Sequence, residues 1–291
     1  MQKYPEQIAD VTDASLSGER VLVTGSTSGI GREAAKAFSR LGAEHVIIHG
    51  RNVSRGKEVV EELSGDGEFV RADFSSFEDI EAVEEAVNGE LDILVNNAGG
   101  YFTDTGTTEG VSFTMAVNHF APFKLTKTVF DVLTSSDRGV VVNVASSAHK
   151  GPRLDFEAVQ NADWGGFRAY QQSKLANILF TRELARRTSS VDTYAVHPGA
   201  IPGSGFARNM PGPTKFLAEA EIVDRLSAVA PYFKTVYDGA GMIMYGALGA
   251  DEHGKYYAGF EKTRPSKAAR NDEDASKLWE MSEDVTDTTF L

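Results

Sequence analysis

The stretch "VLVTGSTSGIGREAAKAF", residues 21–38, decides the fold. It opens with an apolar run typical of a buried strand and closes with a helical pattern. Gly25, Gly29 and Gly31 lie between the two, where glycine lets the backbone turn tightly and approach a bound group. Backbone N–H groups at the start of a helix attract phosphate. The stretch therefore predicts a strand, a phosphate-binding turn and a helix, the alternative being a glycine-rich turn without a ligand.

The same alternation of short apolar runs and helical patterns continues along the chain. Runs rich in Val, Ile and Leu occupy residues 20–24, 45–50, 67–73, 91–99, 138–146 and 191–199. Strands buried on both faces and separated by helices are typical of a parallel sheet. We therefore expect an α/β fold, a single-domain Rossmann-type doubly wound parallel sheet over 18–291, preceded by an extension at 1–17. The Gly and Pro content of 200–232 predicts an irregular excursion or a lid beside the substrate site.

Composition excludes several classes of function. The chain has 291 residues and a formal net charge of -13, which argues against nucleic acid as a partner. It has no cysteine, and its six histidines lack the spacing of a zinc site, so we expect neither a disulfide nor a bound metal. The polar N-terminus predicts no secretory signal. Because no apolar run has membrane-spanning length, we expect a cytoplasmic protein without membrane insertion.

The end of the second apolar run bears on the choice of nucleotide. It closes with "HGRN", residues 49–52, in which Arg51 follows Gly50 and no carboxylate is present. In dinucleotide-binding folds an acid at this point binds the ribose 2′-hydroxyl, whereas an arginine accepts a 2′-phosphate. The pattern favours NADP(H), with NAD(H) as the alternative if Arg51 is only a solvated surface residue.

Tyr170 and Lys174 lie four residues apart in the helical stretch "AYQQSKLANILF", residues 169–180, and so share one face. A nearby ammonium stabilises a phenolate and lowers the pKa of a tyrosine from its usual value of about 10. By itself such a pair is common on the surface of an ordinary helix. Its interpretation depends on the motifs elsewhere in the chain.

Five motifs, in this order, resemble those of the short-chain dehydrogenase/reductase family. They are "TGSTSGIG" (24–31), "NNAG" (96–99), "VNVASS" (142–147), "YQQSK" (170–174) and "HPG" (197–199). Two longer stretches, "SKLANILFTRELARR" (173–187) and "TYAVHPG" (193–199), and the tail that begins at residue 254, are similar to the retinol-dehydrogenase-like branch of that family. The resemblance covers most of residues 18–285.

The resemblance implies an active site of Asn118, Ser147, Tyr170 and Lys174. Tyr170 would be the acid/base, and Lys174 would lower its pKa and hold the nicotinamide ribose. Ser147 would orient the substrate oxygen, and Ser146, one residue earlier, is expected to face the other way on a strand. Asn118 would anchor a water molecule in a proton relay.

The resemblance also implies a cofactor site. In it Asp73 would contact the adenine, and the residues from Asn97 to Gly99 would line the adenosine ribose. The full expected set is Gly25, Ser26, Ser28, Gly29, Ile30, Gly31, Arg51, Asn52, Asp73, Phe74, Asn97, Ala98, Gly99, Tyr170, Lys174, Pro198 and Gly199. Gly203 stands where the family usually has a Thr or Ser that touches the nicotinamide amide, and Ser204 follows it. His149 and His197 are expected to be structural.

The expected function is hydride transfer between a nicotinamide cofactor and an apolar aldehyde or ketone, or the matching alcohol. Phe102, Trp164, Phe206 and Met210 would line an apolar substrate pocket or pack in the core. A non-catalytic NADP-binding sensor on the same fold is the alternative, and the absence of cysteine disfavours reduction of a C=C bond. The family often dimerises through two long helices, one of which is expected at 109–134, and members of this branch vary, which leaves a homo-oligomer open.

Overall fold

The computed structural model describes residues 3–103, 106–160, 165–201 and 234–291, and within them seven parallel strands form one sheet. A short antiparallel pair, β5 (Thr107–Thr108) and β6 (Val111–Ser112), lies apart from it. In the order of their pairing, the seven are β3 (Asp66–Arg71), β2 (His45–Gly50), β1 (Arg20–Val23), β4 (Ile93–Asn96), β7 (Val140–Val144), β8 (Asp192–His197) and β9 (Tyr256–Ala258). The expected Rossmann-type doubly wound sheet is confirmed.

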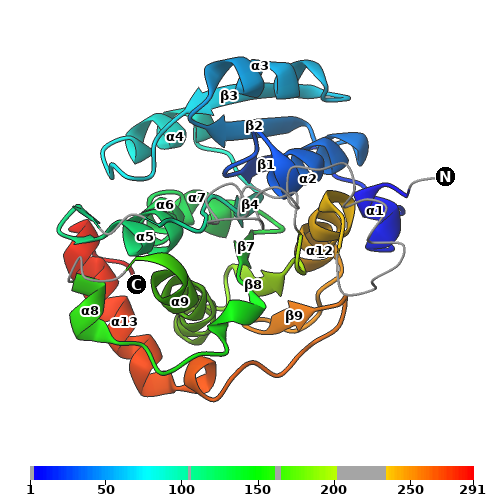
Figure 1. Ribbon diagram of the computed structural model, residues 1–291. Helices are drawn as coiled ribbons and strands as arrows, with labels where there is room; N and C mark the ends of the chain where they lie inside the picture. The colour runs from blue at the N-terminus through cyan, green and yellow to red at the C-terminus, as the bar shows by residue number, and fades with distance from the viewer. Residues whose placement is uncertain (1–2, 104–105, 161–164, 202–233) are drawn as a thin grey trace.

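Helices cover both faces of the sheet (Figure 1). One face carries α2 (Gly29–Arg40), α3 (Val53–Glu61) and α12 (Val236–Leu248), and the other carries α4 (Ile80–Val87), α6 (Ala121–Thr128) and α9 (Gly166–Arg187). Successive residues of β1 alternate between the two cores. Val21 and Val23 join the cluster under α2 and α12, and Leu22 joins the cluster under α6 and α9. Both faces are therefore buried, as the continuous apolar runs require.

The strand order places the ligand-binding edge of the sheet. From β1 the chain proceeds outward through β2 and β3, and then returns to the other side of β1 with β4. The carboxyl ends of parallel strands meet at one edge, and open sheets of this kind bind ligands there, where the winding direction changes. The glycine turn after β1 and the residues after β4 and β7 all lie at this edge.

The segment 109–134 differs from the expected long helix. It contains β6, the short helix α5 (Phe113–Met115), a π-helical turn over Ala116–Phe120, then α6 and α7 (Phe130–Ser135). Pro122 has no N–H and cannot donate to the carbonyl of Asn118 four residues earlier, so a regular α-helix would lose a hydrogen bond here. The expectation of one continuous helix was wrong, and Pro122 accounts for the interruption at the π-helical turn. The π-helical turn contains Asn118, which is fully buried.

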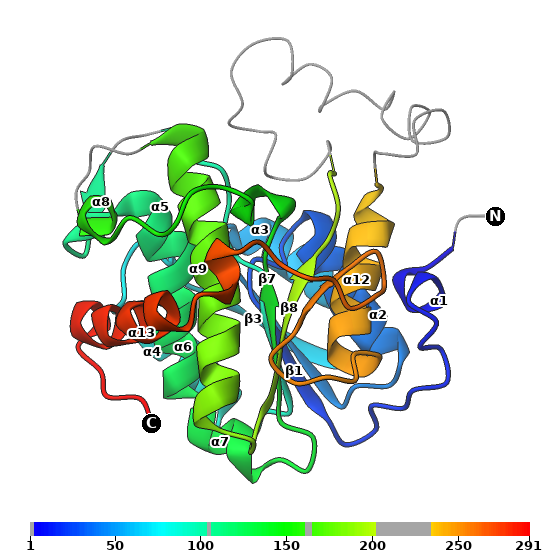
Figure 2. The same cartoon turned by 90° about the horizontal axis from the view of Figure 1, so that it is seen from below.

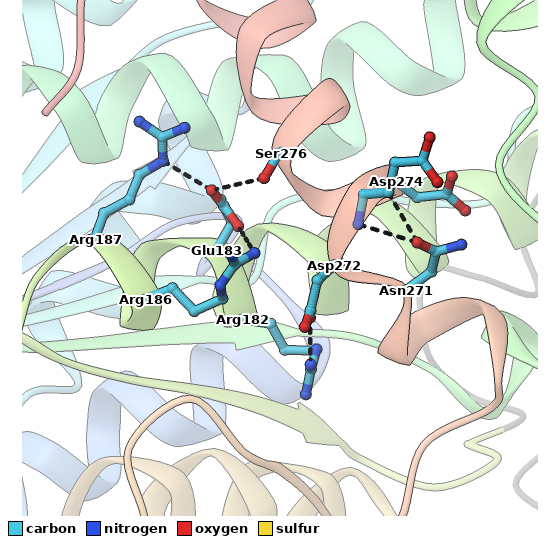
Figure 3. Close-up of polar contacts among 9 residues, drawn as sticks. Arg182, Glu183, Arg186, Arg187, Asn271, Asp272, Asp274 and Ser276 are labelled. Atoms are coloured by element: carbon cyan, nitrogen blue, oxygen red, sulfur yellow. Dashed lines mark hydrogen bonds and ion pairs between the residues drawn. The ribbon is translucent and has the colours of Figure 1, made fainter.

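The helix α9, which carries Tyr170 and Lys174, is fastened on its outer side by α13 (Asp272–Thr286), as seen in Figure 2. Figure 3 shows the contacts. The Glu183 carboxylate accepts hydrogen bonds from Arg186 (2.8 Å), Arg187 (3.0 Å) and Ser276 of α13 (3.3 Å). Trp279 of α13 is buried in the same core cluster as Phe180 of α9. The Ser276 hydrogen bond and the Trp279 packing tie α9 to α13, whereas Arg186 and Arg187 belong to α9 itself.

The N-terminal residues also pack onto the domain. The short helix α1 (Pro5–Ile8) lies against α12 and α2. Glu6, which is largely buried, accepts two hydrogen bonds from the Arg40 guanidinium at 2.7 and 2.8 Å. A further short helix, α8 (Phe156–Gln160), lies near β6. Most of the lid expected at 200–232, namely residues 202–232, lies outside the described residues.

Candidate active site

Lys174 lies at the carboxyl end of β7 and is almost completely buried, with 5% of its surface exposed. Its ammonium donates a hydrogen bond to the carbonyl of Val144, the last residue of that strand, at 2.9 Å. Burial disfavours the charged form and lowers the pKa of Lys174 from 10.5 to about 8. The ammonium nitrogen lies 5.7 Å from the centre of the Tyr170 ring. The two residues therefore meet on one face of α9, as the sequence predicts.

Tyr170 is buried, and this burial raises the pKa of its phenol above the ordinary value. A hydrogen bond with the Ser146 side chain acts in the opposite direction and lowers the pKa, but burial is the larger cause. The ring of Tyr101 lies edge-on to it, with 6.3 Å between ring centres. In these surroundings the expected lowering of the Tyr170 pKa by Lys174 is not the dominant effect, because desolvation outweighs it.

The serine beside Tyr170 is Ser146, and Ser147 is exposed. The sequence argument assumed that the strand continues through residue 147, which would turn Ser146 away. Instead β7 ends at Val144, and Ser146 caps the short 3-10 helix Ser147–His149 by accepting a hydrogen bond from the Ala148 N–H at 3.2 Å. Beyond the strand the two-residue alternation no longer applies. The expected position of Ser147 facing the tyrosine was therefore wrong.

His149 holds the turn that carries Ser146. Its Nδ1 lies 2.6 Å from the carbonyl oxygen of Ser146, and its Nε2 accepts a hydrogen bond from the Ser266 N–H at 3.1 Å. These two contacts fit the neutral ring with its proton on Nδ1. Burial lowers the pKa of His149, which is fully buried and stays uncharged in this environment. The structural role expected of His149 agrees with this geometry.

Asn118 connects α9 to the turn after β4. Its Oδ1 accepts a hydrogen bond from the Gly100 N–H at 2.9 Å, and its Nδ2 donates to the Gly100 carbonyl at 2.9 Å and to the Ser173 hydroxyl at 3.0 Å. The amide is thus engaged with protein groups. Gly99 has φ +147 and lies so close that a Cβ there would meet the Asn118 Oδ1 at 2.7 Å. Asn118 fixes the turn 99–100 beside the active site.

The glycine turn between β1 and α2 packs closely on the turn after β4. A Cβ on Gly25 would meet the Ala98 Cα at 2.8 Å, and one on Gly31 would collide with the Asn97 amide. Gly29, in contrast, has φ +61 and no atom within 4 Å of the place where a Cβ would stand. It begins α2, whose first N–H groups have no partner within the helix. The open side of Gly29 and the helix terminus fit a bound pyrophosphate.

A pocket of about 360 Å³ adjoins this turn, lined by Thr27, Ser28, Arg32, Arg55, Glu58 and Val59. Arg32 forms an ion pair with Glu62, while Arg55, on α3, is exposed. Arg51 is 65% exposed, and its guanidinium lies 3.4 Å from the Asp73 carboxylate. The Ser75 hydrogen bonds and Arg51 together lower the pKa of Asp73 despite its partial burial. Two of the pocket's lining side chains are cationic and one, Glu58, is acidic.

The other residues expected in the cofactor site divide into two groups. Ser26 and Asn97 direct their side chains into the protein, where Ser26 donates to the Val23 carbonyl at 2.6 Å and Asn97 to the Thr24 carbonyl at 2.7 Å. Asn52 caps α3 by accepting from the Arg55 N–H at 3.0 Å. The remainder lie on the glycine turn, beside it, or at the ends of β3, β4 and β8: Ser28, Ile30, Phe74, Ala98, Pro198 and Gly199. Gly203 and Ser204 lie outside the described residues.

The substrate side of the site is described in part. Phe102 packs edge-on against Phe113 with 5.0 Å between ring centres, and it is partly buried at the margin of the main core. Trp164, Phe206 and Met210 fall outside the described residues. Among the residues that are described, no group of three or more His, Asp or Glu side chains could hold a metal ion. No helix in the same part of the chain is long and apolar enough to span a membrane.

Comparison with known proteins identifies the family. Residues 19–211 match the family model of short chain dehydrogenases. The chain is 36% identical to retinol dehydrogenase 12 of Bos taurus, over 93% of this chain and 87% of that protein. It is 35% identical to dehydrogenase/reductase SDR family member 13 of Bos taurus, over 92% and 73%.

Solved structures agree with this match. A protein of Mycobacterium paratuberculosis superposes with a TM-score of 0.75 at 26% identity and covers 95% of this chain and 96% of its own. A short-chain dehydrogenase/reductase of Caenorhabditis elegans, solved with cofactor, gives a TM-score of 0.67 at 27% identity, over 84% and 94%. The chain is thus an oxidoreductase of the type that uses a nicotinamide cofactor, and it belongs to the short-chain dehydrogenase/reductase family, in its retinol-dehydrogenase-like branch.

Proposed function

We propose that this protein is an NADP(H)-dependent oxidoreductase that interconverts an apolar aldehyde or ketone and the matching alcohol. The observation that carries the proposal is the meeting of Ser146, Tyr170 and Lys174 at the carboxyl edge of the sheet, beside the glycine turn. A buried acid, a hydroxyl donor and a buried ammonium form the set that proton transfer to a carbonyl oxygen requires.

The roles follow from the contacts. The cofactor supplies or accepts the hydride when bound. Tyr170 donates a proton to the substrate oxygen in the reducing direction, and the Ser146 hydroxyl, its hydrogen-bond partner, orients that oxygen. Removal of the proton leaves a phenolate in a buried site, where an isolated charge is costly. The Lys174 ammonium stabilises the phenolate at this stage, because opposite charges attract strongly where water is excluded.

The preference for NADP(H) is supported by charge at the adenosine side of the site. No acid ends β2, so the usual acceptor for a ribose 2′-hydroxyl is missing. The pocket beside the glycine turn carries Arg55 and Arg32, which suit a 2′-phosphate, and Arg51 lies at the neighbouring strand end. Arg55 is the cation we assign to the phosphate, since Arg32 pairs with Glu62 and Arg51 with Asp73.

The substrate class rests on the relatives. Several of them are named retinol dehydrogenases, from mammals, and that name indicates a long apolar alcohol. We therefore propose an apolar carbonyl compound or alcohol of this kind for the present chain.

Changing Tyr170→Phe tests the function. The variant removes the acid and keeps the ring, so we expect unchanged NADPH binding and a loss of turnover of roughly 10²–10⁴-fold. Turnover is followed by NADPH absorbance on a panel of apolar aldehydes and ketones, and binding by NADPH fluorescence. If the unmutated protein binds NADPH and turns over none of the panel, the non-catalytic sensor is the better account.

The adjacent serines provide a matched pair for the second test. Ser146→Ala removes the donor beside the phenol, and kcat should fall by about 10²–10³-fold, as for other hydrogen-bond donors to a reacting oxygen. Ser147→Ala changes an exposed side chain and should stay within about twofold of the wild type, as surface substitutions do. If kcat falls in Ser147→Ala and not in Ser146→Ala, Ser147 is the serine that orients the substrate oxygen.

A third prediction concerns nucleotide choice. Arg55→Ala removes a charge-assisted hydrogen bond worth about 1.5–3 kcal/mol, so the Kd for NADPH should rise by roughly tenfold or more while that for NADH changes little. Lys57→Ala, an exposed change on the same helix outside the pocket, is the control. Titrations with NADPH and NADH measure these Kd values. A clear preference of the wild type for NADH would contradict the assignment of Arg55 to the 2′-phosphate.

The fourth prediction concerns the stability of the site. The lowering of the Lys174 pKa from 10.5 to about 8 corresponds to about 3 kcal/mol of unfavourable burial of the charged form. This cost is fully present below pH 8 and fades as pH rises toward 10.5, where the unfolded chain also loses the proton. Lys174→Met should therefore unfold at higher denaturant concentration than the wild type at pH 7, with the gap closing by pH 10.

Urea unfolding of both proteins at several pH values measures this gap. Lys57→Met, which changes an exposed lysine, should produce no comparable gap at pH 7. A Lys174→Met variant that is less stable than the wild type at pH 7, by an amount independent of pH, would contradict this prediction. It would show that burial of the charged ammonium does not reduce the stability of the wild type.

A further inference from the structure

His49 is a buried histidine that takes no part in the proton transfer proposed above. It is the fifth residue of β2, with 3% of its surface exposed. Its Nδ1 accepts a hydrogen bond from the Gly25 N–H at 3.1 Å. Its backbone also exchanges two hydrogen bonds with Ser26. The Ser26 N–H donates to the His49 carbonyl at 2.9 Å, and the His49 N–H donates to the Ser26 hydroxyl oxygen at 3.0 Å. One residue thus binds the first two positions of the glycine turn.

The ring of His49 also reaches the segment that follows β3. It stacks on Phe74, with 4.3 Å between ring centres and 23° between planes, and it faces the backbone of Ala72. Phe74 directly follows Asp73, the residue expected to contact adenine. His49 therefore connects the two segments between which the adenosine half of a dinucleotide would lie, the glycine turn and the end of β3.

The geometry fixes the protonation of this ring. Because Nδ1 accepts from Gly25, the neutral ring carries its proton on Nε2. Full burial lowers the pKa of His49 to about 4, although Asp73 and Asp79 act in the opposite direction. Nδ1 therefore stays unprotonated, and able to accept a hydrogen bond, at neutral pH. A protonated ring would place an N–H against the Gly25 N–H and lose the contact.

We propose that His49 is a positioning residue for the nucleotide. It acts by holding the glycine turn and the segment at Phe74, after β3, in the binding geometry. Gly25 has φ +66, a conformation that an unconstrained glycine leaves readily. A turn that is fixed before binding loses less conformational freedom when phosphate arrives, and so binds more tightly. This inference rests on the proposed function, since it requires a dinucleotide at the glycine turn. It adds a residue that touches neither the hydride nor the transferred proton.

Two substitutions separate the acceptor from the ring. His49→Phe keeps an aromatic ring on Phe74 and removes the acceptor, whereas His49→Asn keeps an acceptor at the distance of Nδ1 and removes most of the ring. We expect His49→Phe to raise the Kd values for NADPH and NADH by the same factor, about tenfold or more. The kcat at saturating cofactor should be nearly unchanged. His49→Asn should recover most of that loss. His45→Ala, at the opposite end of the same strand, should bind as the wild type does.

Fluorescence titrations of NADPH and NADH measure these effects, and a long-range ¹H–¹⁵N spectrum of the wild type reports the tautomer of His49 even if a variant fails to fold. An Nε2-protonated ring with an unprotonated, hydrogen-bonded Nδ1 supports the proposal. His49→Phe binding both nucleotides as the wild type does, or a ring protonated on Nδ1, overturns it. A wild type that binds neither nucleotide overturns the proposed function instead, and this result is distinct because it precedes any comparison of variants.

Discussion

A lysine buried against the last carbonyl of β7 is the constraint on which the site depends. The Lys174 ammonium reaches the Val144 oxygen at 2.9 Å only because α9 lies flat on the sheet with its first turns at the carboxyl edge. Burying an ammonium group opposes folding, and the rest of the structure must offset that cost. The packing of α9 on α13, with its hydrogen bond from Ser276 to Glu183, contributes by fixing the far half of α9.

The same edge unites groups that come from distant parts of the chain. The glycine turn follows β1, Asn118 lies in a π-helical turn, and Ser146 caps a 3-10 helix after β7. The glycine turn and Asn118 are held by hydrogen bonds to other segments, and Ser146 is held within its own turn. Asn118 bonds to Gly100, and His149 bonds to Ser146. The site is therefore rigid in the part that would handle the proton, as preorganised electrostatic stabilisation requires.

The sequence predicted what local patterns determine. The doubly wound sheet followed from apolar runs, and the pairing of Tyr170 with Lys174 followed from helical spacing. Ser146 was missed because the end of a strand depends on capping and on the neighbouring strands, which the alternation of side chains does not reveal. Pro122 signals the break at Asn118, because it has no N–H to donate to that carbonyl. The raised pKa of Tyr170 depends on burial by elements far away in the chain, and no local pattern signals it.

The most direct test is a crystal structure of the protein with NADP⁺ bound. The account predicts the pyrophosphate at the N-terminus of α2 beside Gly29, the 2′-phosphate within hydrogen-bond distance of Arg55, and the nicotinamide ring facing Tyr170 and Ser146. A nicotinamide ring remote from Tyr170, or a 2′-phosphate that contacts no arginine, would contradict it.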